Sequence, residues 1–275
     1  MASGTDGRSA AFAAASVPEN YDRHLAPVIF EPWAEMLLEK VGVRSGDRAL
    51  DVASGTGVVA RLAARYAGPE GRVVASDVSA TMLTHAATRA ASPGGAPIEY
   101  LEAAATELPV ADHAFDVVLC QQGLQFFADR AAAAAEMHRV LRPGGAVGVA
   151  VWARGHRIEP FDDYADALIG ASVDPPFPNA YESSSYVIGA EELQTLLSDA
   201  GFAEIDVSVV EHTIVWPSAA ARAAGIRGTP FGPLVARLPP DRREALELDL
   251  LRGAPATSGE PVRRTTTAVL GRARA

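Results

Sequence analysis

Two aspartates and a glycine-rich bend stand out as residues that can bind a ligand. Asp51 lies in the apolar stretch "RALDVA", just before "SGTG", and Asp77 lies near the end of a second apolar stretch, "RVVASDV". Gly55 and Gly57 let the backbone turn sharply and approach a ligand without Cβ atoms in the way. Asp51 can accept a hydrogen bond from an ammonium group, and Asp77 can accept from both hydroxyls of a ribose. The pattern predicts a site for a nucleoside-type cofactor.

The residues alone leave the identity of that cofactor open. The window "GTGVVA" fits the dinucleotide pattern G-x-G-x-x-G/A, which favours a nicotinamide-dependent oxidoreductase. A pyrophosphate would be repelled by Asp51, whereas a ligand with a ribose and an amino-acid part, but no phosphate, would be tolerated. Each aspartate also has a purely structural alternative, Asp51 as an acceptor in the turn and Asp77 as a helix cap.

Alternating strands and helices position these residues. We expect buried strands at 48–53, 72–78, 98–103, 115–121 and 144–152, the last after the turn "RPGG", and helices at 57–67, 79–91 and 129–141. Ser79 is a plausible N-cap for the second of these helices. Such alternation implies right-handed crossovers and a parallel, doubly wound sheet. Ligands bind these sheets beyond the carboxyl ends of the strands, where both aspartates are expected.

The rest of the chain is expected to extend this core into one domain over 17–275. We place a mobile tail at 1–16, a helical preface at 17–47, the cofactor-binding core at 48–152, and partly helical insertions at 153–189 and 217–260. A helix at 190–202 and strands at 203–216 and 262–274 complete the sheet.

Composition narrows the class of protein. The chain has 275 residues, 48% of them hydrophobic, so it can bury a large core. Its net charge of −10 gives no surface suited to nucleic acid or anionic membranes. The single cysteine, Cys120, excludes an intramolecular disulfide framework and any multi-cysteine metal site. With no recognisable leader or membrane span, we expect a cytoplasmic protein without a bound metal.

Four motifs follow one another along the chain, "LDVASGTG", "VVASDVSATML", "FDVVLCQQGLQFF" and "MHRVLRPGG". In this order they resemble the class I S-adenosylmethionine-dependent methyltransferases, of the small-molecule type related to the ubiquinone and menaquinone biosynthesis enzymes. The resemblance is strongest over 20–152. It implies a Rossmann-like, mostly parallel seven-stranded sheet with helices on both faces and a helical cap. It also implies S-adenosylmethionine as cofactor and a small-molecule acceptor.

The resemblance assigns the cofactor site residue by residue. Asp77 would hold the ribose diol, Val78 and Met82 would pack against adenine, and Tyr21 would cover the cofactor as a lid residue. The full set expected to bind the cofactor is Tyr21, Asp51, Ser54, Gly55, Thr56, Gly57, Asp77, Val78, Met82, Ala105, Thr106, Cys120 and Gln121.

Two positions depart from the family pattern. Ala53 stands where the first glycine of the usual triplet is found, a change that a backbone with negative φ would accept. Ala104 stands where the family commonly has an acidic residue that accepts from the adenine amino group. Adenine would then depend on backbone groups near Ala105 and on apolar packing.

The acceptor side is less defined. The residues expected to line it are Gln125, Trp152, Phe161, Tyr181 and Tyr186, which suit a hydrophobic acceptor, although the aromatic ones would serve equally to pack the insertion onto the sheet. If the reaction needs a general base, His156 is the candidate by position, with a surface role as its alternative. The Ala-, Arg- and Gly-rich composition favours a secondary metabolite as substrate. The alternatives are an oxidoreductase and a homologue that binds the cofactor without methyl transfer, such as a cyclase.

Overall fold

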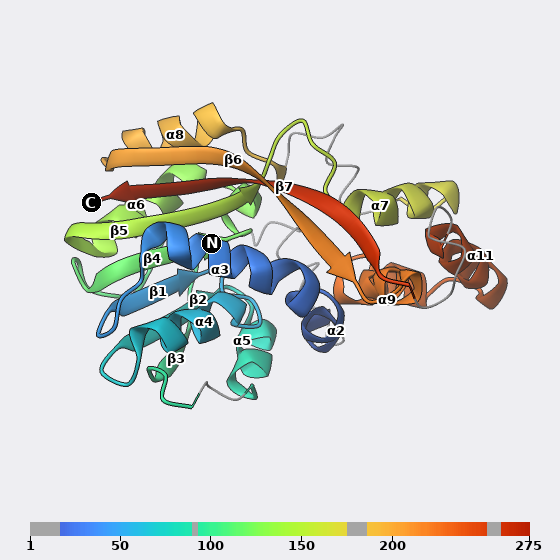
Figure 1. The fold of residues 1–275 in the computed structure, drawn as a ribbon, viewed down its shortest axis with the longest axis horizontal. Helices are drawn as coiled ribbons and strands as arrows, with labels where there is room; N and C mark the ends of the chain where they lie inside the picture. The colour runs from blue at the N-terminus through green and yellow to red at the C-terminus, as the bar shows by residue number, and fades with distance from the viewer. Residues whose placement is uncertain (1–16, 90–92, 175–185, 252–259) are drawn as a thin grey trace, which may run out of the picture.

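A seven-stranded sheet forms the centre of the molecule (Figure 1). The computed structural model describes residues 17–89, 93–174, 186–251 and 260–275. The strand order is β3-β2-β1-β4-β5-β7-β6, and β7 alone runs antiparallel to its neighbours. The strands are β1 (Arg48–Val52), β2 (Arg72–Asp77), β3 (Ile98–Glu102), β4 (Phe115–Gln121), β5 (Leu141–Trp152), β6 (Ala203–Trp216) and β7 (Val262–Arg274). The predicted fold class is confirmed.

Helices cover both faces of the sheet, so its central strands are buried on both sides. Every residue of β4 is buried, as expected for a parallel strand between two helical layers. One core contains α3 (Glu31–Val41) and α4 (Val58–Ala67), and the other contains α6 (Arg130–Val140) and α8 (Ala190–Asp199). The Ser79 hydroxyl accepts from the backbone N–H of Met82 and caps α5 (Ala80–Ala87), as predicted.

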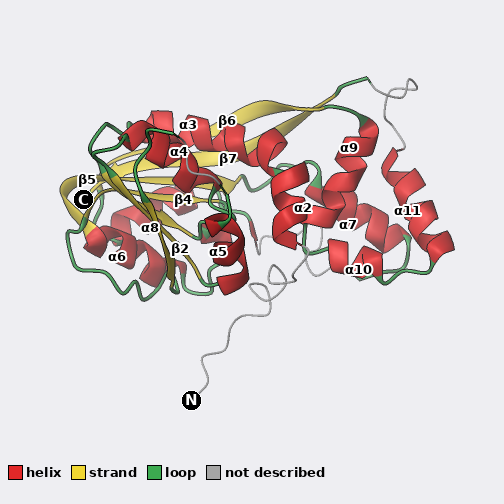
Figure 2. Cartoon of the chain, turned by 90° about the horizontal axis from the view of Figure 1, so that it is seen from below, coloured by secondary structure: helices red, strands yellow, loops and turns green. Residues whose placement is uncertain are grey.

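A second group of helices gathers at the carboxyl end of the sheet (Figure 2). Strands β6 and β7 extend from the sheet to this group (Figure 1). Its members are α2 (Val17–His24), the π-helical turn η1 (Ala26–Phe30), α7 (Phe161–Gly170), α9 (Ala219–Ala224), the 3-10 turn η4 (Gly225–Gly228), α10 (Gly232–Ala236) and α11 (Pro240–Leu251). They come from the helical preface and both insertions, and α2, η1, α7 and η4 contribute residues to one wall of the cavity below. No helix in the described ranges has the length and apolar character needed to cross a membrane.

Several predicted boundaries differ from the structure. Strand β5 begins at Leu141, which pairs with Phe115 before a register shift, so "RPGG" lies within the strand rather than in a turn before it. Helix α5 ends at Ala87, where 91 was expected. Helix α8 ends at Asp199 and is followed by Gly201 in the left-handed conformation, with φ +94°. The predicted tail at 1–16 and Tyr181 lie outside the described residues.

Candidate functional site

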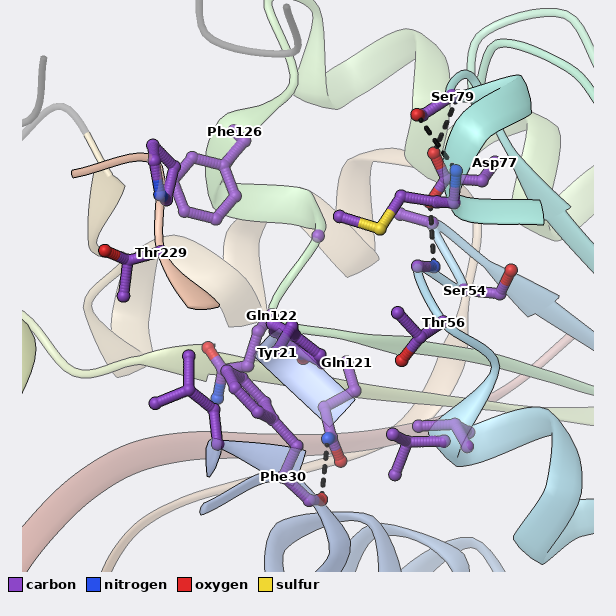
Figure 3. Close-up of a pocket in the computed structure, with 18 of the residues that line it drawn as sticks. Tyr21, Phe30, Ser54, Thr56, Asp77, Ser79, Gln121, Gln122, Phe126 and Thr229 are labelled. Carbon is purple, nitrogen blue, oxygen red and sulfur yellow. Dashed lines mark hydrogen bonds between the residues drawn. The ribbon is translucent and has the colours of Figure 1, made fainter. Parts of the chain in front are cut away.

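A cavity of about 210 Å³ opens between the carboxyl ends of β1, β2 and β4 and the helical group (Figure 3). This is the switch point of the strand order, where β1 and β4 are neighbours and their following helices lie on opposite faces. The lining has a polar half formed by Asp51, Ser54, Gly55, Thr56, Asp77, Ser79, Gln121 and Gln122. An aromatic half is formed by Tyr21, Phe30, Phe126, Phe127, Trp152, Phe161, Tyr186 and Phe231.

Asp77 is fixed by backbone donors. One carboxylate oxygen accepts from the Gly55 N–H at 2.8 Å, and the other accepts from the Ser79 N–H at 2.8 Å (Figure 3). Burial raises the pKa of Asp77, and these N–H groups partly oppose that shift. A carboxylate oxygen has more than one lone pair, so each can also accept from a ribose hydroxyl. Asp77 therefore joins the glycine bend to the expected ribose position.

The bend differs from the expectation at Ala53, where φ is +58°, so the prediction of a negative φ was wrong. This left-handed conformation costs a non-glycine residue about 1 kcal/mol or more. Ser54 holds it by donating its backbone N–H to the Ser76 carbonyl at 2.9 Å. Gly123 makes room for the alanine, because a Cβ at position 123 would lie 2.6 Å from the Ala53 Cβ. Ala53 and Gly123 thus form a matched pair at the tips of β1 and β4.

Asp51 is a buried carboxylate placed to hold a cation. Its side chain is 1% exposed, and Oδ2 has no hydrogen-bond partner among the described residues. Burial raises the pKa of Asp51 well above its usual value, partly opposed by a backbone N–H from Ala60. An ammonium group in the cavity would supply the missing partner.

Stability is expected to depend on pH through Asp51. Because its folded-state pKa is raised above the unfolded value of about 3.9, the folded state binds more protons in that interval, and the free energy of unfolding falls as pH rises through it. The slope from one such group is at most about 1.4 kcal/mol per pH unit. Urea denaturation at pH 5, 6, 7 and 8 should show a smaller slope for Asp51→Asn than for the parent chain. Parallel profiles would contradict this prediction.

Other polar atoms around the bend also lack partners. The Ser54 and Thr56 hydroxyls, Gln121 Oε1 and Gln122 Nε2 are buried and have no hydrogen bond among the described residues. Buried polar groups are normally satisfied, so such a concentration indicates atoms that a ligand satisfies. S-adenosylmethionine carries an ammonium group, a carboxylate and ribose hydroxyls but no phosphate, so the residues present fit it.

The aromatic half brings together residues distant in sequence. The Tyr21 and Phe30 rings stack with centroids 4.6 Å apart, and Phe30 lies 6.5 Å from Trp152 and 6.4 Å from Phe161. Gln121 ties this wall to the sheet, since its Nε2 donates to the Phe30 carbonyl at 2.9 Å (Figure 3). Of the predicted acceptor residues, Trp152, Phe161 and Tyr186 line the cavity.

Several predicted site residues lie elsewhere. The predicted residues absent from the cavity lining are Gly57, Ala105, Thr106, Cys120, Gln125 and His156. Gly57 shapes the bend as the α4 N-cap, with φ +79°. Cys120 is fully buried, and burial raises its pKa to about 12, so its thiol stays protonated near neutral pH. His156 lies between β5 and α7, half-buried.

The described residues contain no cluster of three or more His, Cys, Asp or Glu side chains placed to bind a metal.

The sequence reasoning also missed residues that line the cavity. They are Leu25, Phe30, Ala53, Val58, Val59, Ser79, Gln122, Gly123, Phe126, Phe127, Ile158 and the stretch 228–231. The pair "FF" beside Gln125 follows soon after a strand end, and ligands bind such sheets beyond the carboxyl ends of their strands, so its position was an available signal. The stretch 228–231 lies more than a hundred residues after the bend, and no local pattern links the two.

Comparison with known proteins gives consistent results. The model of the ubiE/COQ5 methyltransferase family matches residues 12–216. The ubiquinone/menaquinone biosynthesis C-methyltransferase UbiE of Hahella chejuensis is 41% identical over 114 residues, 41% of this chain and 46% of that enzyme, so the match spans about half of its length. UbiE of Stenotrophomonas maltophilia is 31% identical over 200 residues, 68% of this chain and 79% of the enzyme.

A solved structure shares the fold. Phosphoethanolamine N-methyltransferase 2 of Haemonchus contortus, in complex with phosphomonomethylethanolamine and S-adenosylhomocysteine, has a TM-score of 0.63 at 18% identity. The similarity covers 100% of this chain and 60% of that one. At this identity the similarity shows a shared fold and nothing more.

Proposed function

Because the chain belongs to the ubiE/COQ5 methyltransferase family and is thus an S-adenosylmethionine-dependent methyltransferase, we propose that it methylates a small hydrophobic acceptor bound in the aromatic half of the cavity. One observation carries the proposal. The polar half around Asp51 and Asp77 opens directly into a wall of aromatic rings, and the two halves meet at Gln121 and Gln122. A cofactor and an apolar acceptor are thereby brought into one enclosure.

The polar half would hold the cofactor by complementary groups. Asp77 would accept from the ribose hydroxyls, Asp51 would pair with the ammonium group, and Val78, which is 44% exposed, would pack against adenine. When bound, S-adenosylmethionine supplies a methyl group on an electrophilic sulfonium. Tyr21, in α2, would cover this half from the side of the helical group.

The aromatic half would work by alignment and exclusion of water. No His or Lys side chain occurs among the cavity-lining residues that the structure describes. The hydroxyls of Tyr21 and Tyr186 have pKa values raised by burial, so they are poor sources of a negatively charged base. Methyl transfer from a sulfonium is an in-line displacement, and holding the nucleophile at attack distance supplies much of the acceleration. His156 does not line the cavity, so the proposed mechanism makes no use of it.

The setting of the reaction is also a proposal. We place the enzyme in the cytoplasm, supported by its single buried cysteine, and its acceptor among secondary metabolites, supported by the Ala-, Arg- and Gly-rich composition of the chain. The curated relatives act in quinone biosynthesis by name, which is consistent with a hydrophobic acceptor of either origin.

Calorimetric titration tests the cofactor, and a methyl-transfer assay tests the reaction. We expect micromolar binding of S-adenosylmethionine and S-adenosylhomocysteine and none of NADH. In the assay, tritium from the labelled methyl group should appear in hydrophobic acceptors of an aromatic panel. Binding of NADH alone would contradict the proposal. Cofactor binding without transfer to any member of a broad panel would instead favour a non-methylating homologue.

A further inference from the structure

Gln122 lies at the tip of β4, where the two halves of the cavity meet (Figure 3). Its backbone is left-handed, with φ +54°, and its N–H donates to the Ala150 carbonyl at 2.7 Å. A glutamine in this conformation is unusual and is maintained only when its surroundings fix it. Its side chain is 8% exposed and lines the cavity. A large polar side chain is thus held buried at the boundary.

A second glutamine orients the Gln122 amide. Gln125 is fully buried, and its Nε2 donates to Gln122 Oε1 at 3.0 Å. The Gln125 backbone is held in turn by Arg130, whose Nη2 donates to its carbonyl at 2.7 Å. With Oε1 engaged, Gln122 offers the cavity its Nε2, a buried donor without a partner among the described residues.

This donor differs from the polar groups that face the cofactor. Asp51, Asp77 and Gln121 present oxygen atoms to the cavity, which suit the ammonium group and the ribose hydroxyls. Gln122 presents N–H groups, and the chain continues from it directly into Gly123 and Phe126, which line the aromatic half.

Another polar side chain of the aromatic half is already satisfied. The Thr229 hydroxyl donates to the Ile226 carbonyl at 2.6 Å and accepts from the Phe231 N–H at 3.1 Å. Unlike the Thr229 hydroxyl, Gln122 Nε2 is a buried donor without a partner among the described residues, so it can donate to a polar atom of the methyl acceptor. Leaving a buried donor without a partner costs free energy, so a methyl acceptor that brings no oxygen atom to Gln122 should bind more weakly.

We propose that Gln122 determines acceptor specificity by donating a hydrogen bond from Nε2 to an oxygen atom of the acceptor, and that Gln125 is the positioning residue that holds this amide. The inference rests on the proposed function, since it needs the acceptor to lie in the aromatic half. It selects ring compounds that carry a carbonyl, hydroxyl or oxyanion oxygen over hydrocarbons of the same shape.

A pair of matched probes tests the proposal in the full chain saturated with S-adenosylhomocysteine. The probe 1-tetralone has a carbonyl oxygen that only accepts, and tetralin is the same bicycle without it. Calorimetry should show 1-tetralone binding about 10-fold more tightly than tetralin, the value of roughly one buried hydrogen bond. In Gln122→Leu the ratio should fall to within about twofold. Gln194→Leu, an exposed glutamine of α8, should keep the parent ratio.

The outcomes separate this inference from the function beneath it. Unchanged binding of S-adenosylhomocysteine by Gln122→Leu, together with loss of the 10-fold preference, supports the inference. An unchanged preference in Gln122→Leu overturns it and leaves the proposed function standing. Loss of S-adenosylhomocysteine binding in Gln122→Leu also overturns it, because the amide would then serve the cofactor. Failure of the parent chain to bind S-adenosylhomocysteine would contradict the proposed function itself.

Discussion

Replacing Asp77 with alanine is expected to weaken binding of S-adenosylhomocysteine by at least about 100-fold. Each hydrogen bond to a charged group contributes about 1.5–3 kcal/mol, and two ribose hydroxyls are involved, so the loss is about 3 kcal/mol or more. The substitution also releases the Gly55 and Ser79 N–H groups that hold the bend in place. Calorimetric titration at pH 7 measures the change.

Glu102→Ala is the matched control for this experiment. Glu102 ends β3 directly beside Asp77 in the register of the sheet, but it is exposed and does not line the cavity. Its removal should change the dissociation constant less than twofold. Circular dichroism would verify that both variants are folded. Equal affinities for the two variants would show that the ribose lies away from β2 and would contradict the site.

The core of the site could be predicted because its signals are local. A buried strand, a glycine bend and an acidic strand end each occupy a few consecutive residues, so the sequence predicts that Asp51 and Asp77 lie at one edge of the sheet, and both line the cavity. The same holds for β6 and β7, whose predicted ranges match the structure.

The remaining features depend on contacts between segments distant in sequence. The left-handed Ala53 is possible because Gly123 lies opposite it, and no pattern around residue 53 reports that neighbour. Gln121 donates to the Phe30 carbonyl across 91 positions of the chain. The position of His156 just after β5 predicts a place at the site, yet Ile158, two residues later, lines the cavity instead. In an irregular segment, tertiary packing decides which side chains point into a cavity. The conformational propensities of the individual residues do not contain that information.

A buried ion cluster holds the aromatic wall in place. Arg222, in α9, has a side chain only 5% exposed and pairs with Glu159 at 3.0 Å and with Asp163. Glu159 lies between Ile158 and Phe161, both of which line the cavity. Burial raises the pKa of Glu159, and Arg222 opposes that shift. The cluster thus ties the loop before α7 to α9.

Arg222→Met is therefore expected to lower the free energy of unfolding by about 3 kcal/mol. Removing one partner leaves buried carboxylates without their cation, which is the costly way to break such a pair. Arg264, 3.6 Å from Glu159, compensates in part. Urea denaturation at pH 7 measures the loss. The cost should shrink at pH 5, where Glu159, with its raised pKa, is more readily protonated once Arg222 is gone.

Arg227→Met is the control, because the Arg227 side chain is 57% exposed and its pair with Glu247 is worth less than about 1 kcal/mol. Equal destabilisation by the two variants would contradict a special role for the buried cluster.

Arg222→Met should also affect binding of the acceptor and binding of the cofactor differently. The cluster braces the wall that bears Phe161 and leaves the contacts of Asp77 unchanged. Arg222→Met should consequently raise KM for the acceptor several-fold while the Kd of S-adenosylhomocysteine stays within twofold, since the acceptor wall and the cofactor bend are anchored by different parts of the chain.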